Sequence, residues 1–271
     1  MSRAFRVSSA DILHFPLNDY QKIDMRFKIT PNVGPRYWAA IAIASMCGAN
    51  QGDIVSDILK MSPGASLTML AIMFAVVTLA ERATTRGSEV FYWVAILIVR
   101  AAATNIADYS IGHAHFTYVE VSVALAIILI GLIALPQVLR RKPITTGLPP
   151  TGSLYWFTML TAGSLGTVMA DGIGHSFSSV QIGVPLSASI ATVALLVILS
   201  VKSRMAWVGA ASYWAVVVAV RWWGTNVGDM SAFFLSLVVS AAITGVALTM
   251  LLVIWRAPPI ERADDERPLG A

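Results

Sequence analysis

The stretch YWAAIAIASMCGANQGD, residues 37–53, decides the fold because variants of it occur four times along the chain. Each copy begins with Tyr-Trp and carries Asp fifteen residues after the Trp. Chance rarely produces four matches at one offset, and a recurring internal pattern is the signature of a repeat architecture. The sequence therefore predicts four structural repeats. Their Trp and Asp are Trp38 and Asp53, Trp93 and Asp108, Trp156 and Asp171, and Trp214 and Asp229.

Other positions agree between the copies once the Trp is taken as the origin. Small residues bracket a polar step between ten and fourteen residues after each Trp. The polar residues of this step are Thr104, Thr167 and Thr225 at the eleventh position and Asn50, Asn105 and Asn226 at the twelfth. Seven residues after the Trp, the second and fourth copies carry Arg100 and Arg221, whereas the first and third carry Ser45 and Gly163. This alternation indicates a two-copy unit that is itself duplicated.

The composition is that of an integral membrane protein. Of the 271 residues, 56% are hydrophobic and 13% are charged, and the mean hydropathy is +0.71, whereas a soluble domain carries roughly 25% charged residues. The apolar runs are about 20 residues long, which is the length of a membrane-crossing helix, and open strands cannot cross lipid with unpaired backbone groups. Eight helical spans are predicted, near residues 36–59, 66–82, 89–112, 117–139, 153–175, 182–201, 206–229 and 232–255.

The chain divides into a membrane domain at 36–256 and two cytoplasmic tails at 1–35 and 257–271. Each copy of the motif belongs to a pair of spans, and a pair returns the chain to the same side of the membrane. The four copies therefore share one orientation, as parallel repeats about an axis along the membrane normal. The predicted fold class is all-α, a polytopic membrane protein with eight transmembrane helices from four parallel two-helix repeats. These repeats cover about 36–82, 89–139, 153–201 and 206–256.

The basic residues predict the orientation of the chain. Sixteen of the nineteen Lys and Arg fall on the side of the two tails, Lys60 falls on the other side, and Arg100 and Arg221 lie within spans. Positive charge marks the cytoplasmic side of a membrane protein. We therefore expect both termini in the cytoplasm. This placement also accounts for the isoelectric point of about 9.4 without a nucleic-acid partner.

The spacing within the motif predicts an inner ring of helices. Fifteen residues at 1.5 Å each place the Asp about 22 Å from its Trp along a helix, toward the outer side of a ~30 Å hydrocarbon core. The Tyr-Trp pair then lies at the cytoplasmic interface, where aromatic residues commonly anchor helices, and the expected role of each Trp is that of an anchor or of a packing position. At about 100° per residue, Trp, Thr and Asp share one helix face. We expect the first helix of each pair to turn this face toward a common axis or cleft, and the second helix to face lipid.

Three interpretations of the four Asp remain open on the sequence alone. The carboxylates can cap or pair with backbone at the outer helix ends. Two of them can pair with Arg100 and Arg221 of a neighbouring repeat, since a lone guanidinium within a span is too costly to leave unpaired. They can also form a cation or proton site, because carboxylates brought together repel one another unless a cation or protons neutralise them. In that case Asn50, Asn105 and Asn226 would supply neutral oxygen ligands, with the three Thr beside them.

A second layer of candidate ligands lies one helical turn further out. It consists of Asp57, His113, His115 and His175. Carboxylates and imidazoles together suit a divalent metal such as Zn, Ni or Mn. The alternative is a set of solvated loop histidines. We find no G-x-S-x-G, H-E-x-x-H, phosphate loop or cysteine pair, so the sequence does not predict an enzyme.

These residues resemble a family of bacterial membrane proteins built from four tandem two-span repeats, each with a characteristic Trp. The resemblance covers residues 36–256 and rests on the four Trp and four Asp together with Gly48, Gly166 and Gly224. It implies eight spans and an inner-membrane location, and it implies no settled activity. Repeats of that family often read Gly-Glu, whereas this chain has no carboxylate at the second of these positions. The residues there are Ala49, Thr104, Thr167 and Thr225.

The sequence favours a transporter or channel-like carrier for a cation, with the Asp ring binding or gating. The first alternative is a membrane scaffold whose polar ring is structural, and a membrane enzyme comes third. A carrier requires a polar cleft that reaches the Asp, whereas a scaffold requires the Asp to be paired and dry. The expected partners are the lipid bilayer and a small cation or other small molecule, with a divalent metal ion as the candidate cofactor. The oligomeric state stays open, a homo-oligomer included.

Overall fold

The computed structural model describes residues 27–85, 87–140, 148–204, 209–255 and 260–261. The described part is almost entirely helical, and the prediction of an all-α chain is confirmed. Its helices are α1 (Pro35–Asp53), α2 (Pro63–Ala83), α3 (Glu89–Asp108), α4 (Tyr118–Arg140), α5 (Ser153–Gly174), α6 (Val180–Arg204), α7 (Gly209–Leu235) and α8 (Leu237–Ile254), with π-helical turns η1 (Ile54–Ile58) and η2 (Tyr109–His113) after α1 and α3. Each of the eight predicted spans overlaps one helix, with the largest difference at the turn between α7 and α8, which lies at residue 236 rather than near 230.

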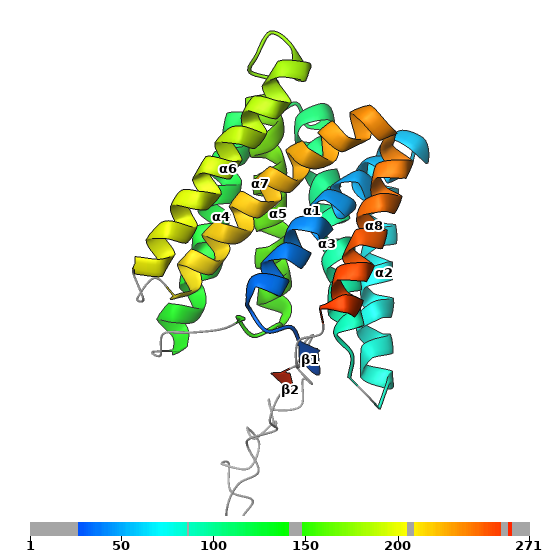
Figure 1. Cartoon of the computed structure of the whole chain (residues 1–271), viewed down its shortest axis with the longest axis vertical. Helices are drawn as coiled ribbons and strands as arrows, with labels where there is room; N and C mark the ends of the chain where they lie inside the picture. Colours follow the sequence, from blue (N-terminus) through cyan, green and yellow to red (C-terminus); the bar gives the residue numbers. More distant parts are fainter. Residues whose placement is uncertain (1–26, 86, 141–147, 205–208, 256–259, 262–271) are drawn as a thin grey trace, which may run out of the picture.

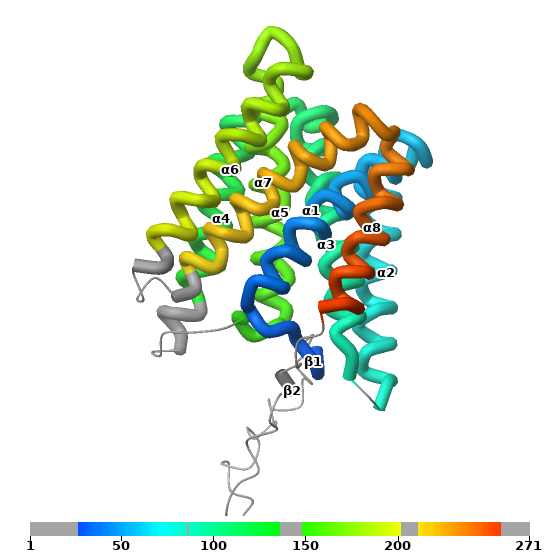
Figure 2. Tube along the Cα trace, viewed as in Figure 1, coloured from blue at the N-terminus to red at the C-terminus, as the bar shows by residue number. Residues whose placement is uncertain are grey.

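The helices form two concentric layers around one axis (Figures 1 and 2). The inner layer is a closed ring, because α1 packs against α3, α3 against α5, α5 against α7, and α7 against α1. Each outer helix packs on an inner helix, α2 on α3, α4 on α5, α6 on α7 and α8 on α1. We call the end of the bundle that carries β1 (Ile29–Thr30) and β2 (Ile260–Glu261) the lower end and the opposite end the upper end.

Within the described ranges, five helices are long and apolar enough to cross a membrane, namely α2, α3, α4, α6 and α8. In the most apolar windows of the four outer helices, between 6% and 22% of the residues are buried, against 67% in α3. The outer helices therefore expose apolar side chains over most of their surface, as helices that face lipid do. The other inner helices, α1, α5 and α7, carry more small and polar residues than the outer helices do. A helix shielded by its neighbours tolerates such residues.

Local signals in the sequence account for several helix starts. The Ser62 hydroxyl accepts a hydrogen bond from the Ala65 amide, with Pro63 at the first helical position of α2, where the missing N–H of proline costs nothing. Before α4, the Thr117 amide donates to Glu120 and the Glu120 amide donates to the Thr117 hydroxyl. This reciprocal pair is a capping box. It begins α4 at the upper end of the bundle.

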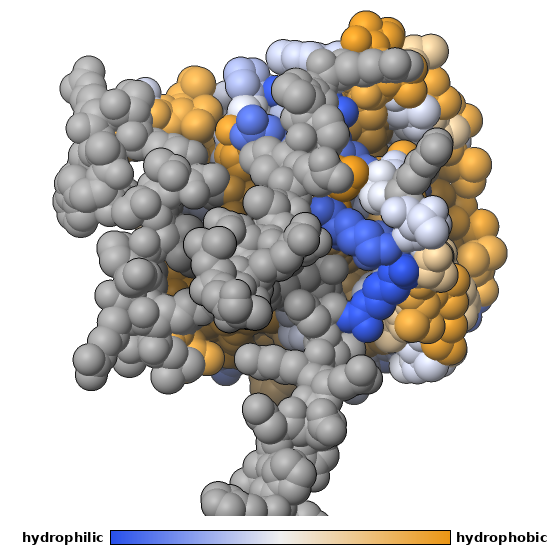
Figure 3. Space-filling view, turned by 90° about the horizontal axis from the view of Figure 1, so that it is seen from below, coloured by the Kyte–Doolittle hydropathy of each residue, from blue (hydrophilic) through white to orange (hydrophobic). Residues whose placement is uncertain are grey.

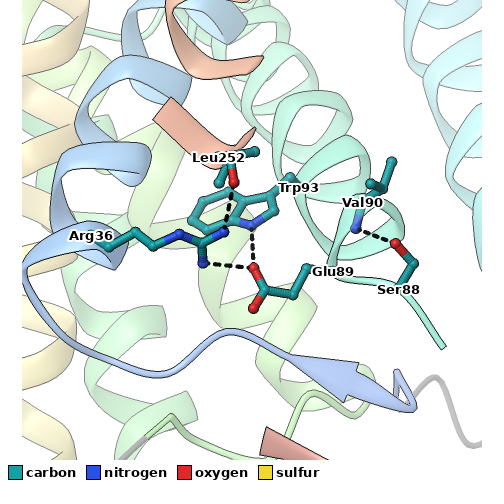
Figure 4. A network of polar contacts seen from close by, with 6 residues as sticks. All are labelled: Arg36, Ser88, Glu89, Val90, Trp93 and Leu252. Carbon is teal, nitrogen blue, oxygen red and sulfur yellow. Dashed lines mark hydrogen bonds and ion pairs between the residues drawn. The ribbon is translucent and has the colours of Figure 1, made fainter. Parts of the chain in front are cut away.

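A polar cluster joins three helices at the lower end (Figure 4). Arg36 of α1 forms an ion pair of 2.7 Å with Glu89 of α3 and also donates to the Leu252 carbonyl of α8. The Trp93 indole donates to the same Glu89 carboxylate. Seen from below, hydrophilic residues lie on part of this end, with hydrophobic residues along the rim (Figure 3). The cluster holds α1, α3 and α8 together where the chain enters the bundle.

The segment before α1 folds under the bundle. Phe27 is 1% exposed and packs against Tyr92 and Trp156, while the Lys28 ammonium donates to three carbonyls at the end of α2. The strands β1 and β2 pair antiparallel. Most of the predicted cytoplasmic tails, residues 1–26, 256–259 and 262–271, lie outside the described residues.

Candidate functional site

The four tyrosines of the Tyr-Trp pairs close the axis at the lower end. Their hydroxyl groups form a complete ring, with oxygen–oxygen distances of 3.1 Å from Tyr37 to Tyr92, 2.6 Å from Tyr92 to Tyr155, 3.2 Å from Tyr155 to Tyr213 and 2.5 Å from Tyr213 back to Tyr37. All four side chains are at most 3% exposed. We call this set the tyrosine ring. These tyrosines were not among the predicted site residues, although their recurrence beside each Trp was a signal in the sequence.

Each Trp packs on the tyrosine of the preceding copy. The ring centroids lie 5.6–5.8 Å apart with tilts of 45–48° in all four contacts. Three of the Trp are 3–4% exposed, so they lie among the helices. Of the two structural roles expected for the Trp, headgroup anchor or packing position, their burial fits packing, because they hold the inner ring together. The contacts are Trp93 on Tyr37, Trp156 on Tyr92, Trp214 on Tyr155 and Trp38 on Tyr213.

Small residues let the inner helices approach closely above the tyrosine ring. The residue ten after one Trp meets the residue seven after the next, so a Cβ added at Gly48 would lie 2.6 Å from Arg100 Cγ and one at Gly166 would lie 2.6 Å from Arg221 Cβ. Ala103 of the second copy and Gly163 of the third meet in the same way, but here the glycine is the residue seven after the Trp. At each of these contacts at least one side is small. The two arginines are accommodated because the helix facing each of them carries glycine.

Arg100 ties the four inner helices together at the middle of the axis. Its guanidinium donates to the hydroxyls of four residues, one from each copy, and the side chain is 1% exposed. The four acceptors are Ser45 at 3.4 Å, Thr104 at 2.8 Å, Thr167 at 2.8 Å and Thr225 at 2.5 Å. Charge-assisted hydrogen bonds of this kind are stronger than neutral ones. We call this set the Arg100 cluster.

The partners of Arg100 differ from those the sequence predicted. One interpretation of the sequence paired the arginines with Asp of a neighbouring repeat, and the structure provides hydroxyl groups instead. Among the described residues no carboxylate forms an ion pair with Arg100 or Arg221. The interpretation that Arg100 or Arg221 pairs directly with the Asp ring is therefore wrong for this structure.

Above the Arg100 cluster a cavity of about 750 Å³ opens at the upper end of the bundle. The four Asp of the motif line it, and Thr104, Thr167 and Thr225 form its floor. In the described part of the chain, no hydrogen bond or ion pair reaches any of the four carboxylates. The structure therefore contains no contact of the kind expected if these carboxylates capped a helix end or paired with backbone groups. The lining carboxylates are Asp53, Asp108, Asp171 and Asp229.

The three Asn of the motif occupy different places. Asn105 lines the cavity and donates to the Gly52 and Ala101 carbonyls. Asn50 is 0% exposed and donates to Ser240 of α8, while Asn226 is 1% exposed and donates to the Trp222 carbonyl. The structure therefore brings Asn105 to the cavity and leaves Asn50 and Asn226 between helices.

Not all residues of the predicted second layer of ligands reach the cavity. Asp57, His113 and His175 line the cavity, and His115 is not among the lining residues. The two histidines stack on tyrosines that share the cavity wall, His113 on Tyr109 and His175 on Tyr118. In the part of the chain that the structure describes, no group of three or more His, Cys, Asp or Glu side chains is placed to hold a metal ion. Besides carboxylates and aromatic rings, the lining of the cavity thus includes two imidazoles and the ammonium of Lys60.

No protein-family model matches the sequence, and neither a curated protein nor a solved structure gives a significant match.

Proposed function

We propose that the chain is an eight-span membrane protein made of four parallel two-helix repeats that together form a carrier for a cation. The corresponding residues of the four sequence copies make equivalent contacts around the axis, as in the tyrosine ring and the Trp–Tyr packing. This equivalence supports the repeats. The outer helices cover α1, α5 and α7 from outside, and the polar residues of these helices face the axis. This arrangement supports counting them as spans although they are less apolar.

One observation carries the cation proposal, namely four unpaired carboxylates around one open cavity. Carboxylates in a membrane span are costly and mark ion or substrate pathways when they face a cavity. Like charges gathered in one site repel one another, so a bound cation or protons would stabilise them. A scaffold whose polar ring is only structural would instead pair these groups. We therefore favour the carrier over the scaffold.

The closed axis below the cavity favours a carrier over an open channel. A cation that leaves the cavity downward meets Arg100, which is held by four hydroxyls, and then the charge of Arg221. Below them the tyrosine ring has neighbouring oxygens 2.5–3.2 Å apart, which leaves no passage for an ion. Release to the lower side would therefore require the inner helices to move apart, as in alternating access.

The dimensions of the cavity bear on the kind of cation. Its volume of about 750 Å³ is within the range of sites that bind small organic molecules. A dehydrated metal ion needs several ligands that converge on one point at about 2–2.6 Å, and the described side chains are not placed in that way. A hydrated ion or an organic ammonium, which Tyr109 and Tyr118 could also contact through their ring faces, fits the cavity without any rearrangement.

The test is the effect of cations on the melting temperature of the purified protein in detergent. Mn²⁺, Zn²⁺ or an organic ammonium such as a polyamine should raise it, because a ligand that binds only the native state stabilises that state. Asp108→Asn or Asp229→Asn should reduce this rise without unfolding the protein, since no contact is lost with the charge. Glu120→Gln is the matched control, because Gln also serves in a capping box and the residue is outside the cavity lining.

The outcome against the proposal is equally specific. If no cation raises the melting temperature of the wild type while the Asn variants melt lower than the wild type, the carboxylates are structural. The scaffold then becomes the better description of the protein.

A further inference from the structure

Arg221 occupies the same position in its copy as Arg100, yet its surroundings are different. It is 0% exposed, and its Nη2 lies 3.5 Å from the Met159 sulfur. Its Nε and Nη1 have no hydrogen-bond partner among the described residues. Met159 lies one helical turn after Tyr155 on α5, beside the tyrosine ring, whereas the hydroxyls that hold Arg100 belong to the floor of the cavity. Arg221 therefore extends toward the tyrosine ring and Arg100 toward the cavity.

The sequence explains why Arg221 cannot make the same set of hydrogen bonds as Arg100. Arg100 uses the hydroxyl of its own copy, Thr104, and the hydroxyls of Ser45 and Thr167 from the copies on either side. The positions that would serve Arg221 in the same way are Gly163 and Ala49, which carry no hydroxyl. Arg221 would also bring a second positive charge into a cluster that already holds one. Its side chain consequently turns downward.

The resulting state of Arg221 is costly. A guanidinium cannot be deprotonated in a protein, so it cannot remove its charge as a buried carboxylate or amine can. A buried charge that lacks both an opposite charge and hydrogen-bond acceptors is strongly unfavourable. A thioether sulfur is a weak acceptor and supplies no charge. The position calls for a negative charge that the described side chains do not provide.

We propose that Arg221 and the tyrosine ring bind a small inorganic anion of about the size of chloride. Arg221 Nε and Nη1 would donate to it, and a tyrosine hydroxyl such as that of Tyr155 would turn from its neighbour and donate as well, because hydroxyl hydrogens rotate freely. Met159 gives the anion room. Its side chain has three rotatable bonds, and its sulfur, which occupies the acceptor position on Nη2, is similar in size to a chloride ion.

This site is separate from the cation site. The Arg100 cluster lies between Arg221 and the cavity, and Arg221 is not among the residues that line the cavity. The anion site does not depend on whether the Asp ring binds cations. Either site can fail its test while the other stands.

The experiment compares the melting temperature of the purified protein in sodium gluconate, chloride and bromide at one ionic strength. We expect chloride and bromide to raise it saturably by several degrees over gluconate, and Arg221→Met to abolish the rise because the variant keeps the bulk and loses the charge. Arg100→Met makes the same chemical change one layer above. It should lower melting in every salt and still show a rise with chloride.

A crystal grown in bromide gives a second measurement that needs no variant. We expect an anomalous peak within hydrogen-bonding distance of Arg221 Nε or Nη1. The proposal is overturned if halides do not change melting, if the rise survives in Arg221→Met, or if the peak lies elsewhere, for example among basic residues at the lower end. Density at Arg221 without an anomalous signal would identify a water molecule and would also count against it.

Discussion

The exchange of Ala103 and Gly163 offers a sharp test of how the inner helices are held together. A Cβ built on Gly163 would lie 2.8 Å from the Cβ of Ala103, which is closer than two methyl carbons can approach. Both residues are buried in the contact between α3 and α5. Neither backbone can shift freely there, because each helix also packs on other helices. We therefore expect Gly163→Ala to be destabilising although alanine is the better helix former.

The magnitude follows from the geometry. Overpacking a close contact by one methyl group costs about 1–3 kcal/mol, and the gain in helix propensity from Gly to Ala offsets at most about 1 kcal/mol. Ala103→Gly alone should cost roughly 0.5–1 kcal/mol, from propensity and a lost contact. In the double variant the single methyl group again faces a glycine, so its stability should return to within about 1 kcal/mol of the wild type. The expected interaction free energy is thus on the order of 1–2 kcal/mol.

The assay is a double-mutant cycle measured by thermal or denaturant unfolding in one detergent. By the scaling for soluble chains of this size, 1 kcal/mol corresponds to about 2–4 °C in melting temperature. Gly64→Ala is the control, since nothing lies within 4 Å of a Cβ at that position in the first turn of α2, and it should be neutral or slightly stabilising. Additive effects of the two single changes, with no recovery in the double variant, would refute the steric argument.

Two further predictions concern the ends of the axis and the topology. Tyr37→Phe should destabilise the protein by about 1–3 kcal/mol, measured by the same unfolding assay, because it leaves the buried hydroxyls of Tyr92 and Tyr213 without one partner each; an unchanged stability would mean that the ring is not a cooperative unit. Reporter fusions at residues 62, 114, 178 and 230 should report the outside and fusions at 85, 145 and 203 the cytoplasm, as the positive-inside asymmetry predicts; any two reversed readings would contradict the eight-span topology.

Much of the candidate site could be anticipated from spacing. The constant offset between Trp and Asp predicted that four carboxylates would gather at one depth, and the structure places Asp53, Asp108, Asp171 and Asp229 around one cavity. The helix face that carries Thr104, Thr167 and Thr225 was also recognised. These predictions succeeded because helix periodicity relates residues on one helix without any knowledge of its neighbours.

The contacts between helices were not accessible in the same way. The partners of Arg100 are hydroxyls of other helices, and which hydroxyls converge depends on how closely the helices approach one another. The same holds for Asn50 and Asn226, which the helical wheel could not distinguish from Asn105. Their amides are buried in contacts with Ser240 and with the Trp222 carbonyl. All three occupy the twelfth position after their Trp, so the packing around each helix decides which of them reaches the cavity.

By itself, the sequence determined the all-helical class, the apolar outer helices, the four copies and the shared depth of the four Asp, because each of these follows from composition and from periodicity along one chain. Only the tertiary structure decided that the four tyrosines close into a ring, that Ala103 faces Gly163, and that Arg100 and Arg221 point in opposite directions. The two arginines occupy equivalent positions in their copies. The surrounding hydroxyls distinguish them, and those hydroxyls come from helices that are distant in sequence and meet only when the ring closes.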